Sequence, residues 1–242
     1  MQECEKFALE FLQDSSLAPD VAWDDDYERG ERFKAYPDAQ KIALPEIQDE
    51  SGMGLWEAMA ARRSVRQYSD QPLTLEQLAR VLWAAQGVTA TRGEFLLRTA
   101  PSAGGLFPYE TYVLVKNVEG LEPGTYHLNI SDWTLEFIKP GDSSSKLMEA
   151  ALGQKFVGQV PVVIATTILC DRFLWRYKKR GVRYAFIDIG HVGQNIALAA
   201  AAMQMGCCAV GAYFDQSVAD VIGHGRKDEL PVYLNAVGFP AK

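Results

Sequence analysis

The sequence has few of the residues that build metal centres or disulfide frameworks. Its 242 residues include four cysteines and three histidines, and none of them shows a Cys-x-x-Cys or Cys/His metal spacing. We therefore expect no metal site, and we interpret the cysteines as small buried hydrophobes in a reducing compartment. The sequence also lacks a charged and then apolar leader, which favours a cytoplasmic protein over a secreted one.

Several nucleotide-binding and hydrolytic signatures are missing as well. No Gly-x-Gly-x-x-Gly and no Gly-x-x-x-x-Gly-Lys-Ser/Thr occurs, so Rossmann and P-loop folds are unsupported. Without Gly-x-Ser-x-Gly, a serine hydrolase would have no nucleophile elbow. The most apolar run, residues 196–203, is too short to span a bilayer, so we expect no membrane association.

Charge is distributed unevenly along the chain. The formal charge of −7 argues against a general nucleic-acid binder. Residues 1–50 hold 14 acids and 5 bases, whereas residues 51–242 hold 17 acids and 19 bases. The sequence therefore predicts an acidic N-terminal arm, residues 1–50, and a nearly neutral body, residues 51–242. The arm also carries many aromatic side chains, so we expect it to pack along the body or along a partner subunit.

Helices and strands are predicted in mixed order without βαβ regularity, which indicates an α+β fold. The clearest helix begins after Thr74, which can form a capping box with Gln77, and stops at Gly87. The longest helical pattern covers residues 184–205, with Gly206 placed to end it. Further helices are expected over 3–13, 55–62, 144–152 and 217–222, and strands over 112–115, 125–128, 133–138, 160–169, 209–214 and 232–237.

The segment Arg62-Arg-Ser-Val-Arg66 offers three guanidinium groups and a hydroxyl. Arginine forks match phosphate oxygens with two parallel hydrogen bonds. On an extended backbone Ser64 and Arg66 share one face. The alternative is an exposed basic helix end, which the helix dipole favours.

The segment Pro101-Ser-Ala-Gly-Gly-Leu-Phe-Pro108 offers closely spaced backbone N–H groups and small side chains. A flat ring can approach such a backbone closely, and Ser102 can donate a hydrogen bond. The alternative is a plain turn before the next strand. Together, the two segments indicate a phosphorylated aromatic cofactor, with flavin mononucleotide (FMN) as the leading candidate.

Two further segments complete an ordered set: Gly190-His-Val-Gly-Gln-Asn195 and Cys208-Ala-Val-Gly-Ala212. The four segments, in this order and spacing, resemble the nitroreductase family and, within it, the SagB-type dehydrogenase branch. The resemblance covers about residues 40–239, and Lys34-Ala-Tyr-Pro37 is similar to the arm of that branch.

This resemblance implies a nitroreductase-like α+β fold, with a mainly antiparallel central sheet flanked by helices. It also implies an intertwined homodimer with two FMN sites at the subunit interface. The implied cofactor residues are Arg62, Arg63, Ser64 and Arg66 for the phosphate, with Arg98 as an additional contact; Pro101, Ser102, Ala103 and Gly104 for the ring, from the other subunit; and Val210, Gly211 and Ala212 for its reactive edge. A basic C-terminal residue often reaches the phosphate in this family, and here that residue would be Lys242.

Arg176 and Tyr177 are the candidate catalytic residues. In branch members that oxidise azolines, a Lys-Tyr pair occupies this kind of position, and here Arg176 stands in place of the lysine. Tyr177 can donate or accept a proton, whereas Arg176 stays charged and can only stabilise negative charge. The alternative is a solvated cationic surface that continues through residues 178–180.

The resemblance implies an FMN-dependent oxidoreductase with a ping-pong cycle. NADH, NADPH or a substrate C–H bond would reduce the flavin, which would then reduce a second small-molecule substrate. One alternative is an azoline-oxidising dehydrogenase of peptide modification. The other is a non-catalytic subunit that binds flavin or a partner protein.

Overall fold

A computed structural model describes residues 3–17, 28–47, 52–93 and 95–241. The triple aspartate of the arm, residues 24–26, and Lys242 lie outside these ranges. No helix of the described residues is long and apolar enough to cross a membrane. Within the same residues, no three His, Cys, Asp or Glu side chains gather into a potential metal site.

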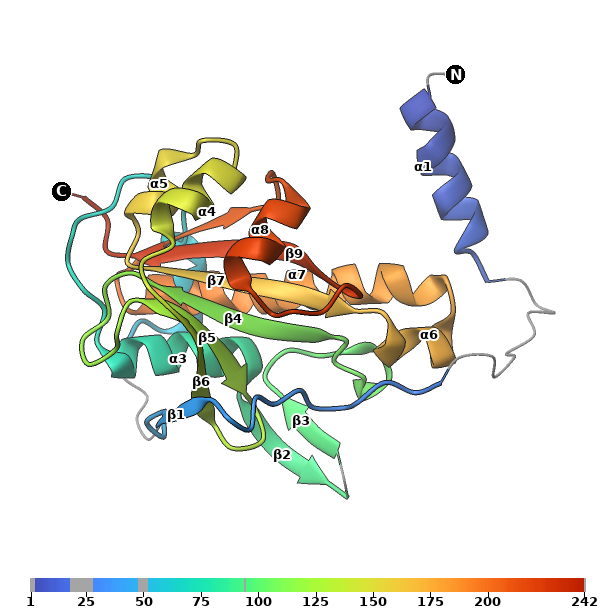
Figure 1. Ribbon diagram of the computed structural model, residues 1–242, viewed down its shortest axis with the longest axis horizontal. Helices are drawn as coiled ribbons and strands as arrows, with labels where there is room; N and C mark the ends of the chain where they lie inside the picture. The colour runs from blue at the N-terminus through green and yellow to red at the C-terminus, as the bar shows by residue number, and fades with distance from the viewer. Residues whose placement is uncertain (1–2, 18–27, 48–51, 94, 242) are drawn as a thin grey trace.

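One large sheet forms the centre of the molecule (Figure 1). Its seven strands follow the order β1-β6-β5-β4-β7-β9-β8, and every neighbouring pair is antiparallel. A separate hairpin joins β2 to β3. The bounds are β1 Gln40–Ala43, β2 Val88–Arg92, β3 Phe95–Arg98, β4 Tyr109–Val115, β5 Gly124–Asn129, β6 Thr134–Pro140, β7 Val162–Leu169, β8 Gly206–Val210 and β9 Glu229–Gly238.

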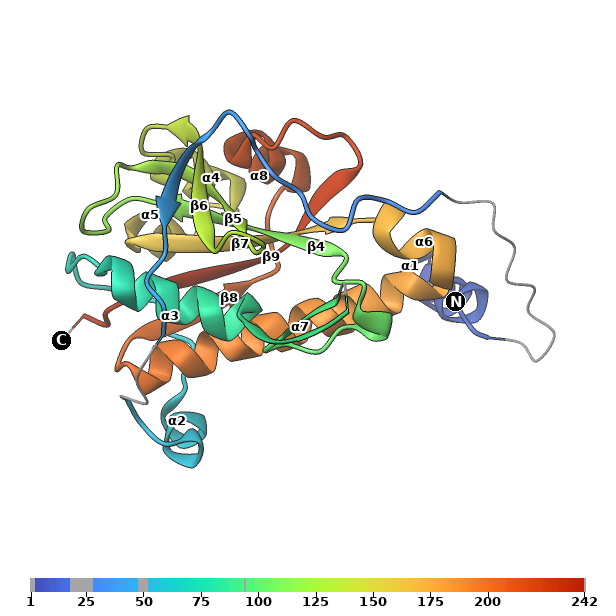
Figure 2. The ribbon, with the colours of Figure 1, turned by 90° about the horizontal axis from the view of Figure 1, so that it is seen from below.

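Helices cover both faces of this sheet (Figure 2). Helices α3 (Leu75–Gln86) and α7 (Arg180–Ala202) pack on one face, and α4 (Ser144–Ala150), α5 (Lys155–Gln159) and α8 (Asp215–Ile222) pack on the other. Strands β4 and β7 are therefore buried at every position. The remaining helices are α1 (Glu3–Asp14), α2 (Leu55–Ala61), α6 (Asp171–Tyr177) and the short 3₁₀ turn η1 (Ala103–Gly105).

The capping box predicted for α3 is confirmed. The Thr74 hydroxyl accepts a hydrogen bond from the Gln77 backbone N–H at 3.1 Å, and the Gln77 side chain accepts one from the Thr74 N–H at 2.9 Å. These two bonds satisfy donors that the first turn of a helix leaves without partners. The helix ends at Gln86, before Gly87, as the sequence predicted.

The predicted bounds of the long helix were wrong at both ends. Helix α7 begins at Arg180 and ends at Ala202, so Gly206 opens strand β8 instead of ending the helix. Gln204 adopts a left-handed backbone with φ of 58°, and this residue turns the chain out of the helix. The sequence also missed β1, the β2–β3 hairpin, α5 and α6.

Residues 30–44 of the arm pack on the body, whereas helix α1 is largely exposed. Strand β1 pairs with β6, and Lys34 reaches a buried carboxylate, its Nζ lying 2.6 Å from Glu229 Oε2. Helix α1 touches the start of α7, where Arg183 Nε donates to Ser15 Oγ at 2.7 Å.

A network of buried charges lies on the α8 side of the sheet. His127 on β5 lies 2.9 Å from a carboxylate oxygen of Glu110 on one side and 2.9 Å from one of Glu136 on the other. Arg172 of α6 pairs with the second oxygen of Glu110, and the backbone N–H of Tyr36 in the arm donates to Glu136. The arm and three strands are thus joined by groups that have little access to water.

Candidate active site

The arginine-rich segment lies against the edge strand β8. Helix α2 ends at Ala61, and the chain then becomes extended. Ser64 forms a parallel bridge with Cys207, and the Val65 N–H donates to the Cys207 carbonyl at 3.1 Å. A Cβ on Gly206 would lie 2.7 Å from the Val65 side chain, so only glycine permits this close contact. Backbone pairing therefore fixes residues 62–66 beside the start of β8.

The three arginines of this segment are not equivalent. Arg63 Nη1 donates to the carbonyls of Ala60 at 2.9 Å and Arg62 at 2.8 Å, so this guanidinium caps the end of α2. Arg62 and Arg66 lie near the thiols of Cys207 and Cys208. Within the described part of the chain, neither Arg62 nor Arg66 has a carboxylate at ion-pair distance.

The donors that remain suit an anion. Ser64 is exposed, and the guanidinium groups of Arg62 and Arg66 have no ion-pair partner among the residues that the structure describes. Unpaired guanidinium groups beside a hydroxyl can bind a phosphate through charge-assisted hydrogen bonds. Strand β8, which pairs with Ser64 at Cys207, continues to Val210, three residues or about 10 Å beyond Cys207.

The residues after β8 present exposed backbone. Gly211 and Ala212 are exposed, and a Cβ on Gly211 would meet no heavy atom within 4 Å. Gln154 of the α4–α5 connection donates to the Ala212 carbonyl at 3.0 Å and holds this turn. A planar ligand could therefore lie against residues 210–212 without displacing a side chain.

The loop of residues 101–108 folds around Asp188 of α7. Ser102 Oγ donates to Asp188 Oδ2 at 2.6 Å, and the Ala103 N–H donates to the same oxygen at 3.1 Å. The Phe107 N–H in turn donates to Ser102 Oγ at 2.9 Å. The Ser102 hydroxyl thus donates to Asp188 in this structure, and a contact of Ser102 with a ligand stays a prediction.

Both candidate catalytic side chains, Arg176 and Tyr177 of α6, pack against this loop. Gly104 has a left-handed φ of 61°, and a Cβ there would lie 2.4 Å from Tyr177 Oη and 3.2 Å from Arg176 Nη1. The Tyr177 ring also packs edge-on against Tyr184, with centroids 5.1 Å apart. The structure thus brings together the catalytic candidates and the candidate ring-binding loop, which are far apart in the sequence.

Arg98 lies beside the 101–108 loop and not with the arginines of residues 62–66. Its guanidinium lies 4.2 Å from the centroid of the Phe107 ring, and Nη1 donates to Gln86 Oε1 at 2.7 Å. Burial lowers the pKa of Arg98 to about 10. A role for Arg98 in phosphate binding stays a prediction.

The chain just before α2 and the 101–108 loop contact α7 at different levels. The Met53 N–H, just before α2, donates to the carbonyl of Ala202 at 3.1 Å, whereas the loop binds Asp188. Asp188 precedes Ala202 by fourteen residues, or about 21 Å of helix. Figure 2 shows α2 beside the C-terminal end of α7.

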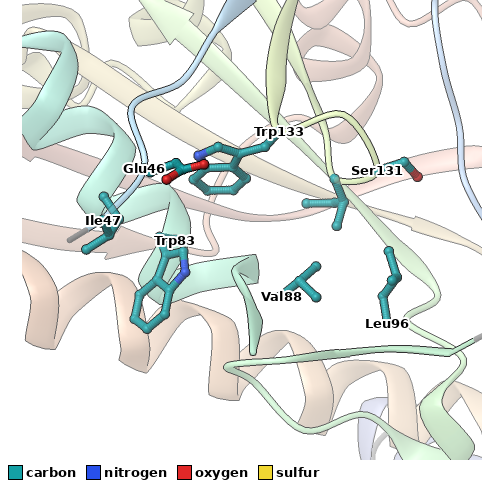
Figure 3. Close-up of a pocket in the computed structure, with 8 residues that line it drawn as sticks. Glu46, Ile47, Trp83, Val88, Leu96, Ser131 and Trp133 are labelled. Atoms are coloured by element: carbon teal, nitrogen blue, oxygen red, sulfur yellow. The ribbon is translucent and has the colours of Figure 1, made fainter. Parts of the chain in front are cut away.

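A cavity of about 440 Å³ lies between α3, β2, β3 and the β5–β6 turn (Figure 3). Trp83 of α3 and Trp133 of the β5–β6 turn line it on two sides, and its other lining residues are Glu46, Ile47, Val88, Leu96, Ile130 and Ser131. None of the predicted site residues lines this cavity.

Comparison with known proteins decides the family. Residues 59–239 match the Nitroreductase family. This chain belongs to the nitroreductase family. MJ1384 of Methanocaldococcus jannaschii, whose name proposes a nitroreductase, is 36% identical over 201 residues, which are 83% of this chain and 97% of that relative. The trifolitoxin-processing protein TfxB of Rhizobium leguminosarum bv. trifolii is 34% identical over 113 residues, 45% of this chain and 30% of TfxB.

Solved nitroreductase structures confirm the predicted fold. A protein of Ralstonia eutropha, also described as a nitroreductase by inference, superposes with a TM-score of 0.73 at 28% identity over 90% of this chain and 98% of its own. A similarly described protein of Anabaena variabilis gives a TM-score of 0.76 at 26% identity over 96% of this chain. This chain spans 46% of the Anabaena protein. The chain is a nitroreductase-family oxidoreductase.

Proposed function

We propose that the protein is an FMN-dependent oxidoreductase that takes electrons from NADH or NADPH and reduces a small molecule. The observation that carries the proposal is that, among the described residues, the guanidinium groups of Arg62 and Arg66 have no carboxylate partner and are fixed with Ser64 beside the edge strand β8. These donors fit a ribityl phosphate, and the exposed residues 211–212, directly after β8, fit the edge of a flat ring. Bound FMN would supply reversible two-electron chemistry.

We also propose that two copies of the chain complete each site. In one copy, the chain just before α2 and the 101–104 loop contact α7 about 21 Å apart, at Ala202 and Asp188, and the segment of residues 62–66 follows α2. In a two-fold dimer, the segment of one copy can face the loop of the other, and the same contact occurs twice.

Exposed apolar side chains support this arrangement. Trp56 of α2 is 82% exposed, and Phe95 and Leu97 of β3 are 39% and 41% exposed. Helix α2 directly precedes Arg62, and β3 directly precedes the loop. If the half-sites of two copies meet, these apolar surfaces therefore approach each other and lose their contact with water.

In such a dimer, Tyr177 and Arg176 would come to the flavin with the loop of the partner copy. The Tyr177 hydroxyl, seated over Gly104, can donate a proton to the substrate or accept one from it. The Arg176 guanidinium, 5.5 Å from the centroid of the Tyr177 ring, supplies a fixed positive charge that stabilises a developing anion.

Anaerobic stopped-flow mixing tests the proposed activity. We expect NADH or NADPH to bleach the flavin absorption of the FMN-loaded protein at about 450 nm, and an electron acceptor to restore it. Flavin that stays oxidised with both donors would instead support a non-catalytic flavin-binding subunit.

A second candidate is the oxidation of an azoline ring in a peptide. Two observations favour it: Tyr177 and Arg176 lie on the candidate flavin loop, and TfxB, named for trifolitoxin processing, is 34% identical over 113 residues. This oxidation removes two electrons and two protons, and FMN would accept the electrons. Arg176→Lys would restore the basic lysine, so the variant should gain or raise activity on an azoline peptide. An unchanged rate in Arg176→Lys would argue against this function.

A further inference from the structure

Asp188 differs from the other buried carboxylates of the described residues. Glu110 pairs with Arg172, Glu136 with His127, and Glu229 with Lys34. Asp188 is 5% exposed and has no lysine, arginine or histidine at ion-pair distance within the described chain. Its hydrogen-bond donors are the Ser102 hydroxyl and the Ala103 N–H, which both belong to the loop.

A buried carboxylate without a cation disfavours folding at neutral pH, because the charge loses its hydration and gains no ion pair. Burial raises the pKa of Asp188, although the two hydrogen bonds oppose that shift. An asparagine of the same shape would avoid this cost. A residue that disfavours stability while it orders a loop fits a functional role better than a packing role.

We propose that Asp188 is a positioning residue that fixes the backbone of residues 102–104 for contact with the flavin ring. The inference rests on the proposed FMN-dependent function and deepens it. The ionised carboxylate accepts from Ser102 and Ala103 together, and Ser102 Oγ then accepts from the Phe107 N–H. These three bonds hold the loop at both ends of the turn.

The same turn seats Tyr177 over Gly104, so Asp188 acts on the catalytic candidate through the loop. A protonated Asp188 would have an O–H in place of one acceptor site, and it would compete with the loop donors. The groups that face Asp188 are His191 from its own helix, Tyr109 from β4, and Ser102 with the Ala103 N–H from the loop. Protonated His191 favours the ionised form of Asp188.

Titration of the full chain with FMN between about pH 4.5 and 8, followed by flavin fluorescence, tests this role. We expect the affinity of the wild type to fall at acid pH, as Asp188 takes up a proton. Asp188→Asn should bind FMN about tenfold more weakly at neutral pH, because a hydrogen bond to a charged group is lost. Between neutral and acid pH the variant should also lose less affinity for FMN than the wild type, because it has no carboxyl group to protonate at this position. The FMN phosphate titrates with a pKa of about 6 in every variant, so the difference between proteins isolates Asp188.

Two further variants keep the test decisive. Ser102→Ala removes one donor and leaves the carboxylate of Asp188. This variant should bind FMN more weakly, and its affinity should still fall at acid pH as in the wild type. Asp70→Asn changes an exposed aspartate and should alter neither property. The thermal stability of Asp188→Asn at pH 7 should equal or exceed that of the wild type, since the buried charge is gone.

The possible outcomes separate this assignment from the proposed function. If Asp188→Asn binds FMN with the affinity and pH dependence of the wild type, the positioning role of Asp188 is wrong, while the proposed function stands. If Asp188→Asn fails to fold, wild-type affinity in Ser102→Ala would overturn the assignment. Failure of the wild type to bind FMN would overturn the proposed function, and the assignment with it.

Discussion

The side chains of an extended backbone point alternately to two sides, and the three arginines of residues 62–66 make different contacts. Ser64 and Arg66 were predicted to share one face, and in the described ranges the Arg62 and Arg66 guanidinium groups have no carboxylate partner. The sequence could not show that Arg63 caps α2, because that contact depends on where the helix ends. The residue types of the proposed anion site are therefore visible in the sequence, whereas the contacts of each arginine depend on tertiary structure.

Arg66→Ala should weaken FMN binding by about 1.5–3 kcal/mol, since it removes a charged hydrogen bond to the phosphate. Arg63→Ala is the matched control and should have a smaller effect, because Arg63 bonds to backbone carbonyls. Fluorescence titration of both variants provides the measurement. Equal dissociation constants for wild type and Arg66→Ala would remove Arg66 from the site.

Gly104→Ala should destabilise the protein without FMN by about 1–2 kcal/mol, because its φ of 61° disfavours any residue with a Cβ. The new Cβ would also displace Tyr177 Oη, which lies 2.4 Å from that position. Gly211→Ala is the control, since a Cβ there meets no atom within 4 Å. Urea unfolding compares the two variants, and equal stability would contradict the proposed seat of Tyr177.

At the scale of elements, local signals predicted α3 well and the edges of the fold poorly. The Thr74 capping box lies within one turn of helix, so the sequence contains all of it. Strand β1 has only four residues, and it exists because β6 pairs with it. The contact between α6 and the 101–108 loop likewise depends on tertiary packing. Short elements defined by distant partners carry no periodic signal of their own.

The buried charges between strands should give stability a bell-shaped pH dependence. Burial raises the pKa of Glu110, but Arg172 and His127 outweigh burial and lower it to about 2. Its contribution is therefore present above about pH 4.5 and is lost as the pH falls toward 2. Burial lowers the pKa of His127, yet Glu110 and Glu136 raise it overall. This contribution is present below about pH 6.5 and is lost as the pH rises through the folded pKa.

Thermal unfolding across this pH range, with His127→Asn as the variant, measures the network. The variant should lose about 3–5 kcal/mol near pH 6, because two buried carboxylates lose a cationic partner. Its stability should also fall less than that of the wild type as the pH rises above about 6.5, because it has no imidazolium to deprotonate at this position. An identical alkaline decline in both proteins would show that His127 stays neutral.

At the scale of the whole molecule, four short motifs were enough to predict the family and the antiparallel α+β fold. Each motif alone is weak, and the information lies in their order and spacing. The separation of the half-sites along α7 was not visible in the sequence, because it depends on which residues of one long helix each segment contacts. That separation is the structural reason to propose a dimer.

Trp56→Glu should dissociate the proposed dimer and weaken FMN binding together, since it places a charge on the exposed face of α2. Leu230→Glu on β9 is the control, because Leu230 is 47% exposed and lies outside the proposed interface. Sedimentation velocity with and without FMN provides the measurement. A wild-type monomer that holds FMN stably would contradict the shared site.

Residues 62–66 and 210–212 are proposed to hold FMN. Reconstitution of the purified chain with FMN, followed by removal of free flavin and absorption spectroscopy, tests this proposal most directly. We expect a yellow protein with one FMN per chain, absorption at about 450 nm, and loss of the flavin in an Arg62→Ala/Arg66→Ala double variant. A folded, colourless wild-type protein that takes up no FMN would contradict it.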